Sequence, residues 1–169
     1  MQKGWINLGT DKYYADALGN IMKGWFLDTD GKMYFFDLTT GAACRGLVDV
    51  GGFRFFFDEN GVQKTGFVDY GAGNKYFDPA LNGSMATSWF AYNGTMHYAD
   101  KDGNQAVGLT EIDKAQYFFR EDGSLIINEL VDVNGAPYMA TETGVLVPIP
   151  VIDTSLIDPV TGIGFGGVD

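Results

Sequence analysis

Three tryptophans are the side chains of this sequence best suited to bind a ligand. Trp5, Trp25 and Trp89 each stand second in a short apolar stretch that opens with glycine or serine. The face of an indole ring attracts an ammonium group and also gives a flat platform for a sugar ring. The same rings would serve equally well as packing between neighbouring elements. We expect both uses in this chain, with ligand binding concentrated at Trp25 and Trp89.

Nucleophilic catalysis finds little support in the sequence. The chain has one cysteine, Cys44, and one histidine, His97, which excludes an intrachain disulfide and a multi-cysteine zinc site. A nucleophilic thiol would need His97 as its partner, but His97 stands in an aromatic segment, where we interpret it as a planar replacement for a ring. Glycosidase chemistry needs two carboxylates facing each other across a groove that holds a sugar. We therefore predict no catalytic residues.

One acidic segment resembles a calcium-binding loop. Asp100–Asn104, with Glu111 further along the chain, has the spacing of an EF-hand. That loop needs glycine at its sixth position, where this chain has Gln105, and a helix on each side. Aspartate, asparagine and glycine recur throughout the chain in segments that suit tight turns. Turn formation is the better interpretation, so no metal site and no cofactor are predicted.

The composition indicates which elements must carry these side chains. Of 169 residues, 24 are glycine, 13 phenylalanine, 9 tyrosine and 3 tryptophan. So many aromatic residues exclude a disordered segment. So many glycines exclude long helices, because each costs about 1 kcal/mol relative to alanine. The length suits one domain, and we predict an all-β protein with many turns.

The charge excludes several classes of partner. The 11 Lys and Arg against 22 Asp and Glu give a formal net charge of −11, and no basic cluster occurs. Nucleic acid and anionic lipid are therefore not expected as partners. No run of 18 apolar residues occurs, so no membrane insertion is predicted. Residues 1–5 lack the pattern of a signal peptide, so we expect either a cytosolic protein or the mature part of an exported one.

Seven repeats of 20 to 22 residues cover residues 4–148. They begin at Gly4, Gly24, Gly46, Gly66, Ser88, Gly108 and Glu129. Each has a large apolar second residue, a short alternating stretch, a turn, an aromatic stretch and a second turn. Two short β-rich stretches around Gly-Gly or Asn-Gly are typical of a hairpin. Because a lone hairpin is marginally stable in water, these hairpins are expected to stack.

The sequence therefore predicts an all-β fold, a β-hairpin solenoid of about seven repeats over residues 4–148. The tail differs from the repeats, because Pro148 and Pro150 disfavour regular strand pairing. Residues 149–169 are predicted to cap the last hairpin or to run on as a linker. Exposed ends of the solenoid would also allow two copies to pair as a homo-oligomer.

The repeat resembles that of a known family. Gly4-Trp5, then Tyr13-Tyr14, then Gly19–Trp25 follow the pattern GWxxxxGxxYYxxxxGxMxTGW, and segments 61–67 and 83–89 are similar to it. This pattern is that of the cell-wall-binding repeats in choline-binding surface proteins of Gram-positive bacteria. Related repeats form the glucan-binding regions of glucansucrases and the repetitive domains of clostridial toxins. The resemblance implies a non-catalytic binding module of a secreted or bacterial cell-surface protein.

Choline-binding members of this family hold a quaternary ammonium group in an aromatic cage between adjacent hairpins. The cage uses the Trp after glycine, a Trp just before the Tyr-Tyr pair, a Tyr of a neighbouring strand and often a Met. This sequence departs from the pattern, because no repeat keeps the second Trp. The residues at that position are Lys12, Met33, Arg54, Asn74, Met96, Gln116 and Pro137. A Lys or Arg at this position would repel choline.

The resemblance leaves two junctions between repeats with most of a cage. One joins repeats one and two through Trp5, Tyr14, Trp25 and Tyr34, with Met22 or Met33. The other joins repeats four and five through Tyr76, Met85, Trp89, Met96 and Tyr98.

These observations favour a module that binds a carbohydrate or another cell-wall polymer. Such a module would anchor a secreted protein to the bacterial envelope or to a glycan. Choline on teichoic acid is the alternative ligand, and the missing second Trp disfavours it. A structural or protein-interaction solenoid whose cages have decayed is the second alternative.

Overall fold

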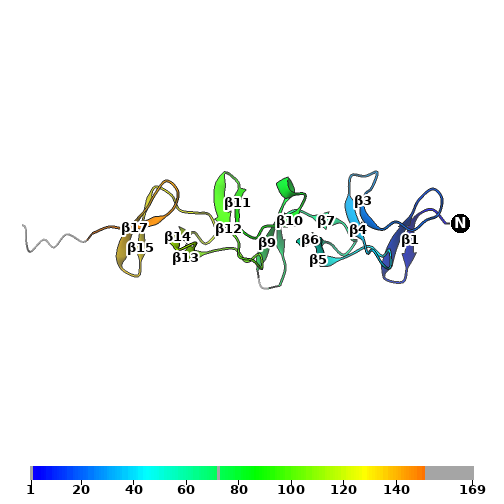
Figure 1. Ribbon diagram of the computed structural model, residues 1–169, viewed down its shortest axis with the longest axis horizontal. Helices are drawn as coiled ribbons and strands as arrows, with labels where there is room; N and C mark the ends of the chain where they lie inside the picture. The colour runs from blue at the N-terminus through cyan, green and yellow to red at the C-terminus, as the bar shows by residue number, and fades with distance from the viewer. Residues whose placement is uncertain (1, 72, 151–169) are drawn as a thin grey trace, which may run out of the picture. The chain divides into compact units, whose positions relative to one another are not determined.

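The computed structural model describes residues 2–71 and 73–150. Within these ranges the chain forms seven small antiparallel sheets and has no α-helix, which confirms the predicted all-β repeat of hairpins (Figure 1). The hairpins fall into two compact units that divide between Ala106 and Val107. Each unit is described by itself.

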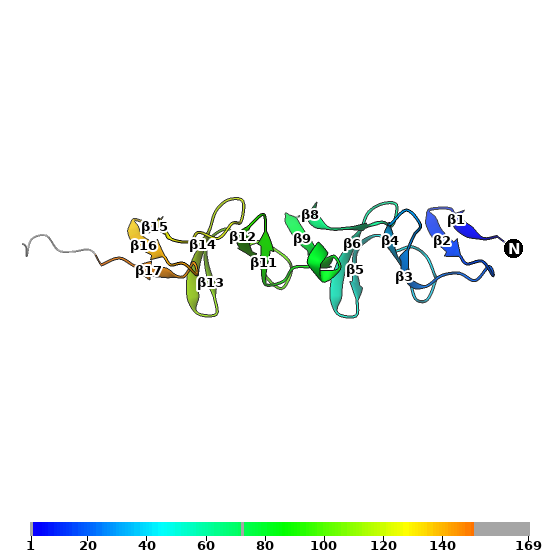
Figure 2. The same cartoon turned by 90° about the horizontal axis from the view of Figure 1, so that it is seen from above.

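The first unit holds five hairpins, which follow one another in chain order (Figure 1 and Figure 2). Its strands are β1 (Gly4–Leu8), β2 (Asp11–Ala15), β3 (Gly24–Leu27), β4 (Met33–Phe36), β5 (Gly46–Val50), β6 (Phe53–Phe57), β7 (Gln63–Lys64), β8 (Gly66–Asp69), β9 (Asn74–Asp78), β10 (Ser84–Met85), β11 (Trp89–Tyr92) and β12 (Thr95–Tyr98). The hairpins are β1–β2, β3–β4, β5–β6, β8–β9 and β11–β12. Strands β7 and β10 add a third strand to two of them, and the 3-10 helix η1 (Pro79–Leu81) follows β9.

The second unit holds two hairpins, β13–β14 and β15–β16. Its strands are β13 (Gly108–Ile112), β14 (Ala115–Phe119), β15 (Glu129–Val133), β16 (Ala136–Ala140) and β17 (Leu146–Pro148). Strand β17 pairs with β16, and the N–H of Ile149 then donates a hydrogen bond to the carbonyl of Pro137. The predicted cap or linker over 149–169 otherwise falls on residues 151–169, which lie outside the described part of the chain.

The second turn of each repeat is built around one position. The carboxylate of Asp58 accepts hydrogen bonds from the backbone N–H groups of Asn60 and Val62, which closes the turn after β6. Such side-chain bonds to the backbone explain why aspartate is favoured in turns. The same position holds Asp16, Asp37, Asp78 and Asp100 in the other repeats of the first unit. In the second unit Arg120 and Thr141 take it.

The most deeply buried side chain of each hairpin also lies at one repeat position, at the end of the aromatic stretch. The side chains there are at most 2% exposed in all seven repeats. They are Ala15, Phe36, Phe57, Phe77, Ala99, Phe119 and Ala140. In five of these repeats the residue faces the glycine that opens the first strand, and in four of the five it is a phenylalanine, as where Phe57 faces Gly46. Because glycine has no side chain, the ring can pack directly over the partner strand.

Successive repeats meet where a turn glycine rests on the previous repeat. A Cβ atom on Gly144 would lie 2.7 Å from Cδ2 of Leu125, and one on Gly61 would lie 3.1 Å from Cβ of Ala43. Both glycines have positive φ, of 82° and 78°. The same relationship joins Gly41 to Ile21, Gly83 to Gln63 and Gly103 to Met85. These turns need glycine both for their backbone conformation and for the close approach.

Candidate functional site

Strand alternation decides which rings meet between hairpins. Adjacent residues of a strand point to opposite faces of the sheet. The hairpin β3–β4 therefore presents Phe26 and Tyr34 on one face and Trp25 on the other. Phe26 and Tyr34 contact Trp5 of the preceding hairpin, whereas Trp25 contacts Phe55 of the following one. We call the contact between hairpins β1–β2 and β3–β4 the first junction, and the contact between hairpins β3–β4 and β5–β6 the second junction.

The first junction brings together four of the residues predicted to form a cage, namely Trp5, Tyr14, Met22 and Tyr34. The Trp5 ring lies 5.2 Å from the Tyr14 ring and 4.7 Å from the Tyr34 ring, between centroids. Phe26 and Phe36 complete the cluster. Burial, followed by the negative charges of nearby aspartates, raises the pKa of Tyr34. This ring therefore stays a neutral phenol in a field that favours a cation.

A cation of the chain already lies on these rings. The ammonium nitrogen of Lys12 is 3.9 Å from the centroid of the Trp5 ring and 5.1 Å from that of Tyr34. Lys12 belongs to β2, and its side chain is half-buried. Ammonium groups within about 6 Å of a ring face are attracted by its quadrupole. The first junction thus holds its own cationic group.

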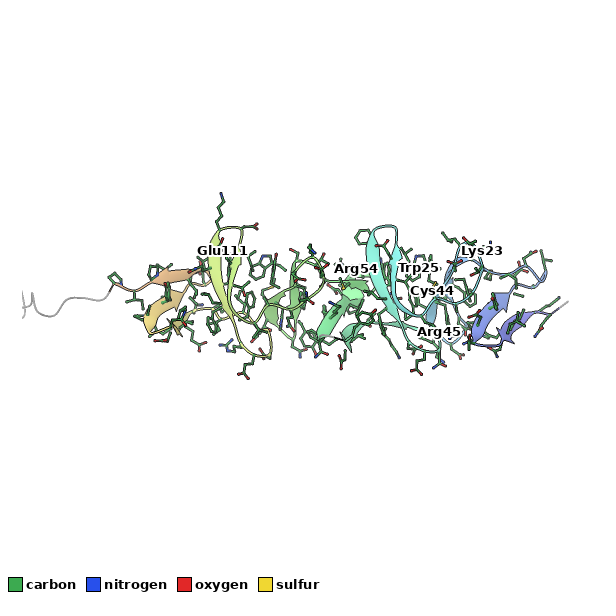
Figure 3. All side chains as sticks on the ribbon, turned by 90° about the horizontal axis from the view of Figure 1, so that it is seen from below. Lys23, Trp25, Cys44, Arg45, Arg54 and Glu111 are labelled. Carbon is green, nitrogen blue, oxygen red and sulfur yellow. The ribbon has the colours of Figure 1, made fainter. Side chains whose placement is uncertain are left out.

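Trp25 belongs to the second junction and does not join Trp5. Its ring lies 5.1 Å from Phe35 and 4.9 Å from Phe55, edge-on in both cases, and 42% of the residue is exposed. Figure 3 shows Trp25 beside the hairpin that carries Arg54. The predicted grouping of Trp5 with Trp25 fails because both stand second in their repeats. Residues at that position face the next hairpin, so each belongs to a different junction.

A groove of about 310 Å³ adjoins Trp25 in the second junction. It is lined by Trp25, Met33, Phe55, Gln63 and Asn82. The amide nitrogen of Gln63 donates a hydrogen bond of 2.8 Å to the carbonyl of Asn82. The lining therefore combines two rings and a thioether with two amides, and it carries no formal charge. Apolar ring faces beside amide donors and acceptors suit a ligand with C–H surfaces and hydroxyl groups.

The junction between β8–β9 and β11–β12 is filled by its own rings. Tyr76 stacks on Phe90 at 4.7 Å, and Phe90 stacks on His97 at 5.3 Å. His97 is 3% exposed, and its ring nitrogens bond to the side chains of Thr95 and Gln105. The histidine thus packs as one of the rings of this cluster, as its aromatic surroundings in the sequence predict.

The other residues predicted to form a cage with Tyr76 lie apart from it. The ring of Trp89 contacts the ring of Tyr98 at 5.2 Å on the opposite face of its hairpin from Phe90. Met96 is 42% exposed, and Met85 is buried beneath Gly103. The alternation of side chains along the strand again separates the predicted residues. Trp89 and Phe90 are neighbours in β11, so they point to opposite faces of the sheet. Ligand binding at Trp89, Met96 and Tyr98 stays a prediction.

Three lining residues of the groove, Phe55, Gln63 and Asn82, were not among the predicted site residues. Gln63 stands two residues after a turn glycine, the position that supports the next repeat. Five repeats have an apolar residue there, namely Ile21, Ala43, Met85, Leu125 and Leu146, whereas two have glutamine, Gln63 and Gln105. A polar amide at a mostly apolar position was the available signal, but the sequence does not distinguish Gln63 from Gln105, whose side chain bonds to His97. Asn82 gives no comparable signal, because asparagine is common in turns.

A cavity of about 640 Å³ lies on the other side of the β5–β6 hairpin. Phe56 and Tyr70, with ring centroids 5.8 Å apart, line it together with charged side chains. Two of these charged side chains, Arg45 and Asp58, already have partners within the chain. Arg45 donates to the carbonyl of Thr10, and Asp58 forms an ion pair with a lysine.

Cys44 is half-buried and packs against the cluster of Phe35, Phe55 and Phe57. Burial, and then the charge of Asp37, raises the pKa of its thiol. In residues 2–71 and 73–150, no group of three or more His, Cys, Asp or Glu side chains gathers in a way that could hold a metal ion. Over the same ranges, no helix is long and apolar enough to cross a membrane.

Comparison with curated proteins identifies relatives among larger chains. Glucosyltransferase-S of Streptococcus mutans is 35% identical over 112 residues, which is 64% of this chain and 8% of that protein. Toxin A of Clostridium novyi is 27% identical over 109 residues, 64% of this chain and 4% of the toxin. The chain thus spans less than a tenth of the length of either relative. No protein-family model matches the chain.

Solved structures share the fold over most of the chain. Choline binding protein F of Streptococcus pneumoniae has a TM-score of 0.76 at 25% identity, covering 86% of this chain and 52% of that one. CbpJ of the same species has a TM-score of 0.75 at 28% identity, covering 86% and 48%. These proteins and the relatives above share with this chain a hairpin repeat of the cell-wall-binding type.

Proposed function

We propose that this chain is a non-catalytic module that binds a neutral carbohydrate polymer at the second junction. The observation that carries the proposal is the groove beside Trp25, with Met33, Phe55 and two amides in its lining. A sugar presents a C–H face that stacks on an indole and hydroxyl groups that bond to amides. The exposed ring and the side chains of Gln63 and Asn82 offer both kinds of contact.

The charge of the chain supports a neutral ligand. The groove lining has no formal charge, and the chain carries a net charge of −11. An anionic polymer would be repelled at long range, whereas a neutral glycan would not. The repeat relationship to glucosyltransferase-S and to choline binding protein F suits a glucan or a cell-wall polysaccharide.

Choline is the alternative ligand, and the fold of choline binding protein F favours it. Two observations argue against choline at the aromatic junctions. A quaternary ammonium group has no hydrogen-bonding atoms, so it would leave the amides of Gln63 and Asn82 unused. At the first junction, Lys12 already lies on the Trp5 ring. We therefore prefer carbohydrate at the second junction.

In the parent protein, the module would hold a secreted or surface chain on the bacterial envelope or on a glycan. Catalysis would then belong to other parts of that protein. Pairing of two copies through the ends of the repeat array stays a prediction, and sedimentation velocity over a range of concentrations would test it.

Calorimetric titration with a soluble glucan, with cell-wall polysaccharide fragments and with choline chloride tests the proposed ligand. We expect a carbohydrate to bind and Trp25→Ala to weaken it by at least about tenfold, or ~1.4 kcal/mol. The matched control is Phe53→Ala, which removes an exposed aromatic ring that does not line the groove and should keep the wild-type affinity. Unchanged affinity in the Trp25→Ala variant would refute this site.

Two other outcomes would refute the proposal and favour an alternative. Binding of choline alone, lost in an aromatic variant, would identify an ammonium-binding module. Absence of binding to all three ligands by a folded chain would favour a structural or protein-interaction role for the repeats.

A further inference from the structure

The first junction has the composition of a binding site for a cation, and its cation comes from the same chain. The ammonium group of Lys12 lies within 3.9 Å of the Trp5 centroid and 5.1 Å of the Tyr34 centroid. These two rings come from different hairpins and are tilted by 58° to one another. Lys12 thus bridges the two hairpins in the way that a bound cation would.

The electrostatic surroundings favour a positive charge at this place. The charges of Asp28, Asp30 and Asp58 act on Tyr34, which is 3% exposed. Aromatic faces and carboxylates attract a cation together, because the quadrupole of the rings adds to the field of the charges. A free ammonium ion and a tethered one would be attracted alike. The tethered group has the advantage of an effective concentration on the order of millimolar or higher.

Lys12 and Met33 occupy the same position in their repeats. Lys12 lies two residues before Tyr14, the cross-strand partner of Trp5. Met33 lies two residues before Phe35, the cross-strand partner of Trp25. The two side chains therefore stand in the same relation to the leading Trp of their hairpins. One carries a charge on the ring, and the other lines a groove beside it.

Arg54 is a third residue at this position, and it shows that a cation there does not always meet a ring. Its hairpin has Leu47 where the others have tryptophan. The guanidinium of Arg54 donates instead to the carbonyl of Lys101 and lies 3.9 Å from a carboxylate oxygen of Asp102. The placement of Lys12 thus depends on the ring of Trp5 beneath it.

We propose that the first junction is an aromatic cation site occupied by the Lys12 ammonium, and that the residue at this repeat position selects which junction accepts an external ligand. At the first junction, the ammonium group of Lys12 occupies the place that an external ligand would take. At the second junction, Met33 lines a groove that a ligand can enter. The proposal for the first junction does not rest on the proposed glycan binding, because the two sites are formed by different rings.

Replacement of the tethered cation by a free one tests the proposal. In Lys12→Ala, tetramethylammonium chloride should change tryptophan fluorescence and raise the melting temperature by a few degrees relative to sodium chloride of equal ionic strength. The unaltered chain and Lys12→Arg should show neither response, because both keep a tethered cation. Lys23→Ala, which removes an ammonium group bonded to the carbonyl of Thr39, is the matched control and should behave as the unaltered chain. A folded Lys12→Ala variant without a response would overturn the proposal, as would an equal response in the unaltered chain.

A measurement on the unaltered chain keeps the proposal testable if Lys12→Ala fails to fold. Ring currents from Trp5 and Tyr34 should shift the Cε proton resonances of Lys12 upfield of those of Lys23. Coincident resonances for the two lysines would overturn the proposal.

Met33→Lys tests the selection at the second junction. The introduced lysine should show the same upfield shift over Trp25, and glycan affinity should fall as far as in Trp25→Ala. A missing shift, or unchanged glycan affinity, would overturn the selecting role of this position. If the unaltered chain binds no glycan, the proposed function fails, while the shift and the tetramethylammonium response still decide the present proposal.

Discussion

Phe57 and Phe53 lie four residues apart on β6 with opposite exposure, 1% for Phe57 and 64% for Phe53. Phe57 packs with Phe35 and Phe55 in the core at the repeat position that is buried in every hairpin. Phe57→Ala should therefore lower the free energy of unfolding by about 3–5 kcal/mol, the usual result of removing a buried ring. Phe53→Ala, the control on the same strand, should change it by no more than about 0.5 kcal/mol. Urea denaturation followed by tryptophan fluorescence checks both values, and equal effects would contradict the assignment of the core.

Gly144→Ala should destabilise the second unit more than Gly135→Ala does. Both glycines have positive φ, of 82° and 84°, so alanine is strained by about 1–2 kcal/mol at either place. Only at Gly144 would the new Cβ meet a buried side chain, that of Leu125, whereas nothing lies within 4 Å of a Cβ at Gly135. We expect an additional loss of about 1–3 kcal/mol for Gly144→Ala from overpacking. Thermal unfolding followed by far-UV circular dichroism would measure the difference, and equal losses would count against close stacking of the repeats.

Acid should destabilise the first unit as its turn carboxylates take up protons. Hydrogen bonds from the turns hold the pKa values of Asp16 and Asp37 below the ordinary 3.8. At Asp58 and Asp100, partial burial opposes the charge, but hydrogen bonds outweigh it and also lower the pKa. A carboxyl with a lowered folded-state pKa contributes its full stability above the unfolded-state pKa and loses it as the pH falls through the folded value. The melting temperature should therefore be steady above about pH 5 and fall below about pH 4.

The three tryptophans, Trp5, Trp25 and Trp89, all belong to the first unit, so their fluorescence reports its unfolding alone. Asp58→Asn keeps a side-chain oxygen that can accept the turn hydrogen bonds but cannot ionise. It should flatten part of the acid transition, because the pKa of Asp58 is lowered in the folded chain. An Asp58→Asn profile identical to that of the unaltered chain would exclude this carboxylate as a source of the pH dependence.

Gln63→Leu should weaken carbohydrate binding while leaving the fold intact. Leucine is similar in size, so it can still support the turn at Gly83, but it cannot bond to a hydroxyl group or to the carbonyl of Asn82. Loss of one or two such bonds should lower the affinity about tenfold. The control is Gln116→Leu, an exposed glutamine of the second unit. Calorimetry with the glycan that binds the unaltered chain would give both affinities, and an unchanged value for Gln63→Leu would exclude its amide from the site.

The hairpins were predictable because their determinants are local. Glycine and acidic residues at turns, with alternating apolar residues between them, define each strand pair within about 20 residues. The cages were harder to predict, because they depend on which faces meet. Trp5 and Trp25 share a repeat position, and that position faces the next hairpin, so they serve different junctions.

The groove was less accessible still to sequence reasoning. Gln63 lies in β7, just after the second turn of its repeat, and Asn82 lies in the second turn of the next repeat. Only stacking brings the two beside Trp25. The sequence does show that Lys12 disfavours choline, because it stands at the position of the missing tryptophan. That its ammonium group would also lie near the ring of Tyr34 depends on the approach of the next hairpin.

The contact between a turn glycine and the repeat before it has a consequence for how such a chain can change in length. Gly41 rests on Ile21 and Gly61 on Ala43, so each repeat is located by its immediate predecessor. Arrays of this kind draw their stability from nearest-neighbour interfaces. If one whole repeat were duplicated or lost, the new neighbours would therefore form the same contact between a turn glycine and the repeat before it. Evolution can thus alter the number of binding junctions without changing the residues of any one of them.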